Sequence, residues 1–435
     1  MQHCCAVHPH CCNAKQQTVQ CGFRPVPRTA CTSEEGWGST AREIFMKQFF
    51  EIALCLTAFA ISSGVVADIL PKSPKAGSVV PLLPENQRKL KNFTSPEERK
   101  SALEDDWKEK KIYYGKKAVW RRQIPVVFSW QCTENEQGPF RITISETPDF
   151  SDPVYLFSKE NCELHADPAD TKFKIGRKYY WKVTGFGKKD VKEKTITESA
   201  SSSFRTEDLV PRWISIQGRV GNIRDLGGYR TTDGKRVKQN IVFRGKGLND
   251  NSADGEIPGQ NRLMIVDLEY FLKDVKIRTD LDLRNARETA NMKVSPLGET
   301  VQFIQHSSPC YGGMFSKRGK SVTAKNFRVF CDAKNYPIYF HCIGGADRTG
   351  SLAFVLEAIL GVPEKEIELD YERTFYPRMK NYQGSAWKSY QILKRGIMKY
   401  GQEGDTLQKR AELYLQDCGI TRQEIEQFRS IILEN

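Results

Sequence analysis

Hydrophobic residues recur with different spacings in two long regions of the chain. Between residues 116 and 206, short runs rich in β-branched and aromatic residues, such as IPVVFSWQC and KYYWKVTGFG, are separated by Gly, Pro and Asp. This spacing is typical of an all-β sandwich. From residue 212 to 435, strand-like apolar runs alternate with amphipathic helical segments. That alternation predicts an α/β domain whose mainly parallel sheet is flanked by helices.

The segment from residue 46 to 67 has the form of a secretory signal peptide. A Met-Lys pair at 46–47 precedes a mostly apolar stretch at 49–61, and Val65-Val66-Ala67 offers a small-residue cleavage pattern. The apolar stretch is short and contains Glu51, so we expect no stable membrane anchor. The segment therefore predicts an exported protein, periplasmic or secreted, that is cleaved near Asp68.

Residues 1–45 and 68–115 are expected to lie outside the two domains. We interpret the first as a non-native or unstructured extension, although its HCCAVHPHCC segment has the residue types of a zinc site. The second is rich in Pro, Lys, Glu and Ser, which predicts a linker with one short helix after Pro96. Six cysteines follow residue 67, too few for a disulfide framework even in an exported protein.

The balance of charges favours anionic partners. The formal net charge is +13, and 27% of residues are charged against 39% hydrophobic, which is a globular composition. No run of Lys and Arg reaches five residues, so we expect no nucleic-acid partner. A phosphorylated protein or a small phosphomonoester fits this charge better. The oligomeric state stays open.

The clearest chemical pattern lies between residues 337 and 360. An apolar strand at 337–340 leads into a glycine-rich loop, and residues 351–360 then favour a helix. The loop is formed by His341, Cys342, Ile343, Gly344, Gly345, Ala346, Asp347, Arg348, Thr349 and Gly350. Backbone N–H groups of such a loop converge at a helix N-terminus, where they bind a phosphate dianion and favour a thiolate. The guanidinium of Arg348 can grip two phosphate oxygens.

This loop is similar to the signature loop of cysteine-dependent protein tyrosine phosphatases. The wider region, about 215–435, resembles the bacterial tyrosine phosphatase family with an HCxxGKDRTG loop. The resemblance rests on NIRDLGGY at 222–229, VFRG at 242–245, DLDLR at 280–284 with Glu288, LGVP at 360–363 and DYERT at 370–374. Members of this family hydrolyse phosphotyrosine, and some also hydrolyse phosphoserine, phosphothreonine or phosphoinositides.

The resemblance implies a role for each residue of the loop. Cys342 is expected to attack phosphorus, Arg348 to stabilise the phosphoryl oxygens, and Asp347 to protonate the leaving group, with Asp282 as the second candidate acid. The expected substrate-binding residues are Ile343, Gly344, Gly345, Ala346, Thr349 and Asp282; the supporting residues are His341, Arg284 and Asp225. Neither a metal nor a cofactor is expected. Arg224, Asp225, Asp282 and Arg284 could instead form a salt-bridged scaffold beneath the loop.

One loop position departs from the family pattern. The family's loop lysine is replaced here by Ala346, which removes a cation beside the phosphate. Because preference for multiply phosphorylated lipids is associated with that lysine, phosphoinositide hydrolysis is less expected. Near the loop in sequence, Cys310 and Cys331 are either buried thiols or disulfide partners of Cys342. The basic segment SKRGKS at 316–321 is either a lid for anions or an exposed loop.

The β-rich region has a resemblance of its own. Val127 to Trp130, Tyr179 to Val183 and Ser203 to Thr206 are similar to the B, F and G strands of a fibronectin type III-like domain. Aromatic side chains alternating along such strands are usually core, although Trp130, Tyr180 and Trp181 could also form a carbohydrate platform.

The sequence therefore predicts an enzyme that hydrolyses phosphomonoesters through a cysteinyl-phosphate, most simply a protein tyrosine or dual-specificity phosphatase. Three alternatives stay open. The chain could be a weak or silent phosphate-binding protein that uses the same loop. It could act on a non-protein phosphomonoester such as a phosphoinositide or sugar phosphate. It could also be an adhesion module led by the sandwich.

Overall fold

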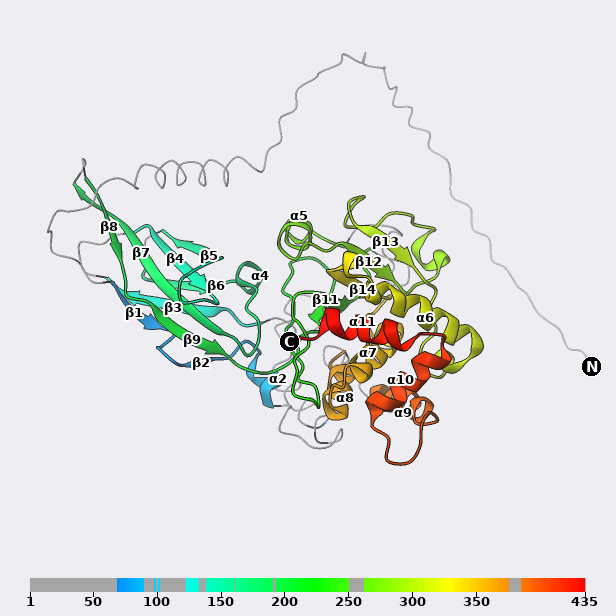
Figure 1. The fold of residues 1–435 in the computed structure, drawn as a ribbon. Helices are drawn as coiled ribbons and strands as arrows, with labels where there is room; N and C mark the ends of the chain where they lie inside the picture. The colour runs from blue at the N-terminus through cyan, green and yellow to red at the C-terminus, as the bar shows by residue number, and fades with distance from the viewer. Residues whose placement is uncertain are drawn as a thin grey trace, which may run out of the picture. The chain divides into compact units, whose positions relative to one another are not determined.

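The computed structural model describes residues 69–89, 98, 101, 123–132, 138–159, 161–190, 193–249, 262–374 and 385–434 (Figure 1). These residues belong to one compact unit that runs from Val66 to Asn435. The expected signal peptide at 46–67 and the extension before it lie outside the described residues, as does most of the region of the short helix expected after Pro96.

Two sheets form the N-terminal part of this unit. The first is antiparallel, in the order β1 (Leu70–Ser73), β3 (Val126–Gln131) and β6 (Glu163–Ala166). The second has the order β2 (Val79–Val80), β9 (Ser202–Thr206), β7 (Lys178–Asp190), β4 (Phe140–Ser145) and β5 (Val154–Ser158), with β8 (Glu193–Glu198) also paired to β7. All of its pairs are antiparallel except β2 with β9. A disulfide joins Cys132, after β3, to Cys162, before β6.

Alternate residues of these strands form an aromatic core. Phe128 and Trp130 on β3 and Trp181 on β7 are buried, as a side-chain period of two requires. The rings of Phe128 and Trp181 lie 5.1 Å apart, and those of Trp130 and Phe140 lie 5.2 Å apart. Trp130 and Trp181 are therefore core residues and cannot form a carbohydrate platform. The fibronectin type III resemblance itself stays a prediction.

The expected linker at 68–115 is wrong for its first part. β1 pairs with β3, β2 pairs with β9, and a short helix, α2 (Glu85–Lys89), follows. Leu82 and Leu83 are buried, and their backbone N–H groups donate to the Glu207 carboxylate over 2.6 and 2.7 Å. The composition misled because short edge strands need few apolar residues and tolerate Pro71, which would exclude a central strand.

The C-terminal part is an α/β domain built on one five-stranded sheet. Its order is β10 (Arg224–Asp225), β11 (Val242–Gly245), β14 (Ile338–His341), β12 (Thr279–Asp282) and β13 (Gln302–Gln305). β11, β14, β12 and β13 are mutually parallel, and β10 runs antiparallel to β11. β14 is thus the central strand, and all four of its residues are buried.

Helices pack around this sheet (Figure 1). The α-helices are α4 (Pro168–Thr171), which precedes the domain, and α5 (Ile265–Glu269), α6 (Lys317–Cys331), α7 (Asp347–Ile359), α8 (Glu364–Arg373), α9 (Ser385–Ile397), α10 (Leu407–Asp417) and α11 (Arg422–Ile432). A π-helix, η4 (Tyr270–Asp274), and the 3-10 turns η5 (Ala286–Thr289), η6 (Tyr311–Phe315) and η7 (Ala333–Asn335) connect them. No helix among the described residues is long and apolar enough to cross a membrane.

α7 is the most deeply buried of these helices. Every residue from Thr349 to Ile359 is buried, because its sequence is apolar on all sides and not only on one face. α7 directly follows the loop after β14. The central strand and the most buried helix of the domain therefore hold the two ends of the loop that contains Cys342.

Candidate active site

Cys342 lies at the carboxyl end of the central strand. His341, Gly245 and Asp282 end β14, β11 and β12 at the same register, so Cys342 projects from the edge where parallel sheets usually bind ligands. Its side chain is buried, and the loop after it reaches Asp347, the first residue of α7. This is the strand–loop–helix arrangement that the sequence predicts. It places the thiol at the N-terminal end of a helix dipole.

Only glycine can occupy position 345 of this loop. Gly345 has a φ of +67°, and a Cβ built on it would lie 2.4 Å from the carbonyl oxygen of Gly245. The Asn222 side-chain amide donates to the carbonyls of Gly344 and Gly345 over 3.3 and 3.1 Å. In a trans peptide the C=O and the following N–H point in opposite directions. The N–H groups of Gly345 and Ala346 therefore point away from Asn222, as an anion-binding loop requires.

A buried ion network supports the loop from below. Arg224 on β10 donates from Nε to Asp370 Oδ1 over 2.7 Å, and Arg244 on β11 donates to Asp370 Oδ2 over 2.5 Å. Arg244 also donates to the Gly345 carbonyl over 3.3 Å. Burial opposes charge on Asp370, but the two guanidinium groups outweigh it and hold its pKa well below the ordinary value. Burial and Asp370 together raise the pKa of the neighbouring Glu357 well above its usual range.

His341 links the loop to the buried carboxylates of Asp280 and Asp282. Its Nε2 lies 2.8 Å from Asp280 Oδ1, and its Nδ1 lies 3.3 Å from the Cys342 carbonyl oxygen. Burial lowers the pKa of His341, but Asp282 and Asp280 outweigh it and raise that pKa. A charged imidazolium can donate to both acceptors. His341 thus contacts the Cys342 backbone, and the supporting role expected for it stays a prediction.

The expectation that Asp282 binds substrate or serves as the second acid is wrong. Asp282 is fully buried and accepts hydrogen bonds from Arg284 Nε and Nη2, at 2.9 and 2.7 Å. Burial raises its pKa, but His341 and Arg284 outweigh this effect and lower it. A buried carboxylate held ionised by its own neighbour cannot reach a leaving group or give it a proton. Asp282 and Arg284 belong to the scaffold, as does Arg224.

Asp225 also has a structural role, but at a different place. Its carboxylate accepts from Arg212 Nη2 at 2.9 Å, from the Asn240 amide at 2.7 Å and from the Gly227 amide at 2.8 Å. It therefore fixes the turn after β10 and contacts no residue of the Cys342 loop among these partners.

Arg348 is held in position by Glu288, which the sequence does not mark as a site residue. The Glu288 carboxylate accepts from Arg348 Nη1 and Nη2 at 2.7 and 2.8 Å, in a bidentate pair. The hydrogen bond from Arg348 lowers the pKa of Glu288. Glu288 lies on η5, whose start is fixed by a capping box between Asn285 and Glu288. In the sequence, only the position of Glu288 shortly after the DLDLR segment points to a role for it.

Asp347 has a partner that the sequence does not indicate. The Tyr311 hydroxyl donates to Asp347 Oδ1, and the Tyr311 amide donates to the Ser351 hydroxyl over 3.0 Å. Tyr311 has a φ of +52°, in the left-handed region that bulky residues avoid. Burial and the contact with Asp347 raise the pKa of Tyr311, so its hydroxyl stays a donor. η6 therefore brings an aromatic side chain to the expected general acid.

Two further polar groups are the Thr349 hydroxyl, on α7 directly after the loop, and the Cys310 thiol. The Thr349 hydroxyl is buried and has no hydrogen-bond partner within the described part of the chain. Cys310 lies near enough to Asp347, Arg348 and Cys342 to interact with them electrostatically, and burial, followed by Asp347, raises the pKa of its thiol. Cys331 precedes β14, whereas Cys342 follows it, so about 13 Å of strand separates them. The Cys331 sulfur contacts the Phe327 and Glu424 carbonyls, which makes it the buried thiol of the two alternatives.

Comparison with known proteins places this domain in a family. The model of a tyrosine phosphatase family matches residues 215–434, half of the chain. The chain belongs to this family. The matched residues coincide with the α/β domain expected at 212–435, and they contain the Cys342 loop, Glu288 and Asp370.

Two individual proteins show more distant likenesses. A protein of Cupriavidus necator that carries the provisional name tyrosine-protein phosphatase is 27% identical over 186 residues; the match covers 37% of this chain and 65% of that protein. The core catalytic domain of the PP-IP phosphatase SIW14 from S. cerevisiae, solved with citrate, is 17% identical. That match covers 36% of this chain and 93% of the other, with a TM-score of 0.23, too low to define a common fold.

The tyrosine phosphatase domain thus combines four elements of one chemistry. A cysteine follows the central strand, and backbone N–H groups and a helix N-terminus face the space beyond it. An arginine is fixed by a carboxylate, and a second carboxylate lies at the start of α7. These groups can bind a tetrahedral dianion, attack it and protonate what leaves.

Proposed function

We propose that the chain hydrolyses phosphomonoesters through a cysteinyl-phosphate intermediate and that its substrates are phosphotyrosine-bearing proteins, with or without phosphoserine and phosphothreonine. The observation that carries this proposal is the pairing of Cys342 with Arg348 across one loop, with Arg348 oriented by Glu288 at 2.7 and 2.8 Å. A guanidinium held on one side by a carboxylate presents its remaining N–H groups in a fixed direction.

In the first step the Cys342 thiolate attacks phosphorus. The S–P bond forms as the P–O bond to the leaving group breaks, and Asp347 gives its proton to the departing oxygen. The loop N–H groups and Arg348 face the three equatorial oxygens and stabilise the charge that develops on them.

In the second step water attacks the cysteinyl-phosphate. Asp347, now ionised, accepts a proton from the water, the P–O bond to water forms, and the S–P bond breaks to release inorganic phosphate. The buried Thr349 hydroxyl, which has no partner in the described part of the chain, is free to donate to the departing sulfur. That donation would lower the energy of the thiolate leaving group.

The burial of Cys342 supports a preference for phosphotyrosine. The residue is only 2% exposed, so the phosphate must be carried on a long and rigid stem to reach the sulfur. A tyrosine ring meets this need better than a serine or threonine side chain. Ala346, which stands where the resembling family has lysine, supplies no cation for a second phosphate and disfavours phosphoinositides.

We further propose that the enzyme acts outside the cytoplasm. Two features support this location: the signal-peptide pattern at 46–67 and the disulfide between Cys132 and Cys162, because disulfides persist mainly in oxidising compartments.

Hydrolysis of para-nitrophenyl phosphate by the purified chain tests the proposed reaction. Cys342→Ser should lower kcat by at least about 10³-fold yet still bind orthovanadate, because the loop and Arg348 remain. Arg348→Ala should lose both turnover and vanadate binding. A wild-type chain that binds vanadate but hydrolyses no member of a panel of phosphopeptides, phospholipids and sugar phosphates would instead be a phosphate-binding protein.

The leaving group tests the proposed acid. Asp347→Asn should lower kcat/KM about 10²-fold or more for alkyl phosphates and much less for aryl phosphates, whose leaving oxygens need little protonation. Equal losses for both classes would show that Asp347 binds substrate and does not donate the proton.

A further inference from the structure

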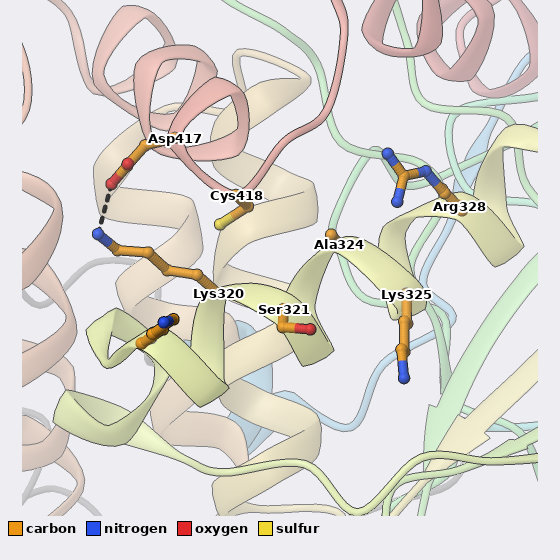
Figure 2. Close-up of a pocket in the computed structure, with 8 residues that line it drawn as sticks. Lys320, Ser321, Ala324, Lys325, Arg328, Asp417 and Cys418 are labelled. Atoms are coloured by element: carbon orange, nitrogen blue, oxygen red, sulfur yellow. Dashed lines mark ion pairs between the residues drawn. The ribbon is translucent and has the colours of Figure 1, made fainter.

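A cationic hollow lies on α6, and none of its residues belongs to the candidate active site. The hollow has a volume of about 500 Å³ and is lined by Lys317, Lys320, Ser321, Ala324, Lys325, Arg328, Asp417 and Cys418 (Figure 2). None of these residues takes part in the chemistry proposed for Cys342. The volume falls within the range of roughly 300–1,000 Å³ that small-molecule sites occupy.

The hollow follows from the sequence of α6. The small residues Ser321 and Ala324 form its floor, while long basic side chains stand before and after them on the helix. The end of α10 supplies the opposite wall. Figure 2 shows Lys320 reaching Asp417 across the gap, with the Cys418 side chain beside them.

Two of the four cations are already neutralised. Lys320 lies 2.5 Å from Asp417, which also accepts from the Tyr400 hydroxyl at 2.7 Å, and Arg328 lies 2.7 Å from Glu424. Lys317 and Lys325 have no carboxylate within 4.0 Å among the described residues. The hollow therefore retains two uncompensated positive charges, one on each side of its small-residue floor.

The spacing of these two lysines sets the kind of ligand that fits. They are eight residues apart on a helix, which corresponds to about 12 Å along the axis. One orthophosphate cannot engage both without drawing the side chains together, whereas a ligand with several linked anionic groups can. Ammonium groups bind phosphate oxygens as point charges and need no fixed angle.

We propose that this hollow is a binding site for a compact, multiply charged phosphate anion, distinct from the site at Cys342. The site binds a chain or cluster of phosphate groups more tightly than orthophosphate, and it contributes nothing to the chemical step. The proposed site depends on the charges of Lys317 and Lys325, which lie outside the Cys342 loop. It therefore does not depend on whether Cys342 turns over substrate.

Calorimetric titration of the full chain with sodium tripolyphosphate tests the proposal. The titration uses Arg348→Ala as background, because that change removes anion binding at the Cys342 loop. This variant should bind one equivalent of tripolyphosphate, and orthophosphate more weakly. Adding Lys317→Ala and Lys325→Ala should weaken binding by at least about tenfold. Lys317→Arg with Lys325→Arg should retain it, because both charges remain.

A matched control separates a local site from the general positive charge of the chain. Lys293 and Lys365 are exposed and, like Lys317 and Lys325, have no carboxylate within 4.0 Å among the described residues, so Lys293→Ala with Lys365→Ala removes the same charge elsewhere. The proposal fails if the control pair weakens binding as much as the α6 pair. It also fails if Arg348→Ala binds no tripolyphosphate, or if tetraglutamate binds as tightly, which would indicate an acidic peptide site.

Discussion

Tyr311 is the residue whose position says most about how acid catalysis would be controlled. Its hydroxyl donates to Asp347, and its backbone is held in the left-handed region, a strain that persists at sites where the surrounding structure requires it. A hydroxyl bonded to Oδ1 fixes the direction of the Asp347 carboxyl group. Tyr311 would therefore position the proposed acid toward the leaving oxygen, and its removal should lower the rate for substrates that need that acid.

We expect Tyr311→Phe to lower kcat/KM for an alkyl phosphate by about tenfold, because the Asp347 carboxyl group loses the hydroxyl that positions it. The kcat/KM for an aryl phosphate, which needs little acid assistance, should fall less. Tyr336→Phe is the matched control, since that hydroxyl donates to the Phe330 carbonyl at the other end of β14. An unchanged kcat/KM for the alkyl phosphate in Tyr311→Phe would show that this contact does not position Asp347.

The residues that could be predicted from the sequence are those that share one loop. Cys342, Asp347 and Arg348 lie within seven positions, so their order alone indicates the chemistry. Glu288 and Tyr311 reach the loop from 60 and 36 residues away, and Asn222 from 122 or more, so only folding reveals them. The role of Asp282 could not be predicted. In the sequence, a carboxylate at the end of a strand looks the same whether its side chain faces a cleft or pairs with a neighbouring residue such as Arg284.

At the scale of elements, Asp370 joins α8 to β10 and β11. It accepts from both Arg224 and Arg244, and all three side chains are buried. Removing the charge of Asp370 would leave two buried guanidinium groups without their shared partner, which is the costly way to break a buried ion pair. The loop that holds Cys342 would lose stability with it, because Arg244 also donates to Gly345.

We expect Asp370→Asn to lower the free energy of unfolding by about 3–5 kcal/mol at pH 7. The pKa of Asp370 is lower in the folded than in the unfolded chain, so its contribution is complete above an unfolded pKa near 4 and decreases as pH falls toward the folded value. Urea unfolding of the wild type should therefore lose stability below about pH 4 more steeply than that of the variant. Asp233→Asn, at an exposed turn, should change stability little at either pH; equal effects of the two substitutions would contradict the buried network.

The elements that could be predicted are those with a strong period or a complete motif. The central strand β14 and the buried helix α7 follow from an apolar run on each side of the loop. β1 and β2 could not be predicted, because edge strands of four and two residues carry too few apolar positions to be distinguished from a linker. Their place in the sheets depends on partners up to 126 positions away, as in the pairing of Val79 with Arg205 and Val80 with Thr206.

At the scale of the whole described unit, Ile175 connects the β-rich part to the catalytic domain. Its amide donates to Gln239 Oε1 over 2.9 Å, and its carbonyl accepts from Gln239 Nε2 at 3.2 Å. Its side chain packs against Gly228, which has a φ of +96°; a Cβ there would lie 2.5 Å from Ile175 Cδ1. The turn at 227–228 is thus shaped to receive a residue of the other part, and Arg236 adds an ion pair with Asp208 at 2.7 Å.

Because this contact is buried, we expect the two parts to unfold together. Ile175→Ala should leave a cavity and cost about 2–5 kcal/mol. It should lower by several degrees the temperature at which the amides of β3 and β7 lose their protection from hydrogen exchange. The temperature at which phosphatase activity is lost should fall by the same amount, although Ile175 is far in sequence from Cys342. Ile196→Ala, at a position 45% exposed on β8, should move neither temperature. If Ile175→Ala lowered the hydrogen-exchange midpoint and left the activity midpoint unchanged, the β-rich part would be an independent module, and the contact between Ile175 and Gly228 would not stabilise the catalytic domain.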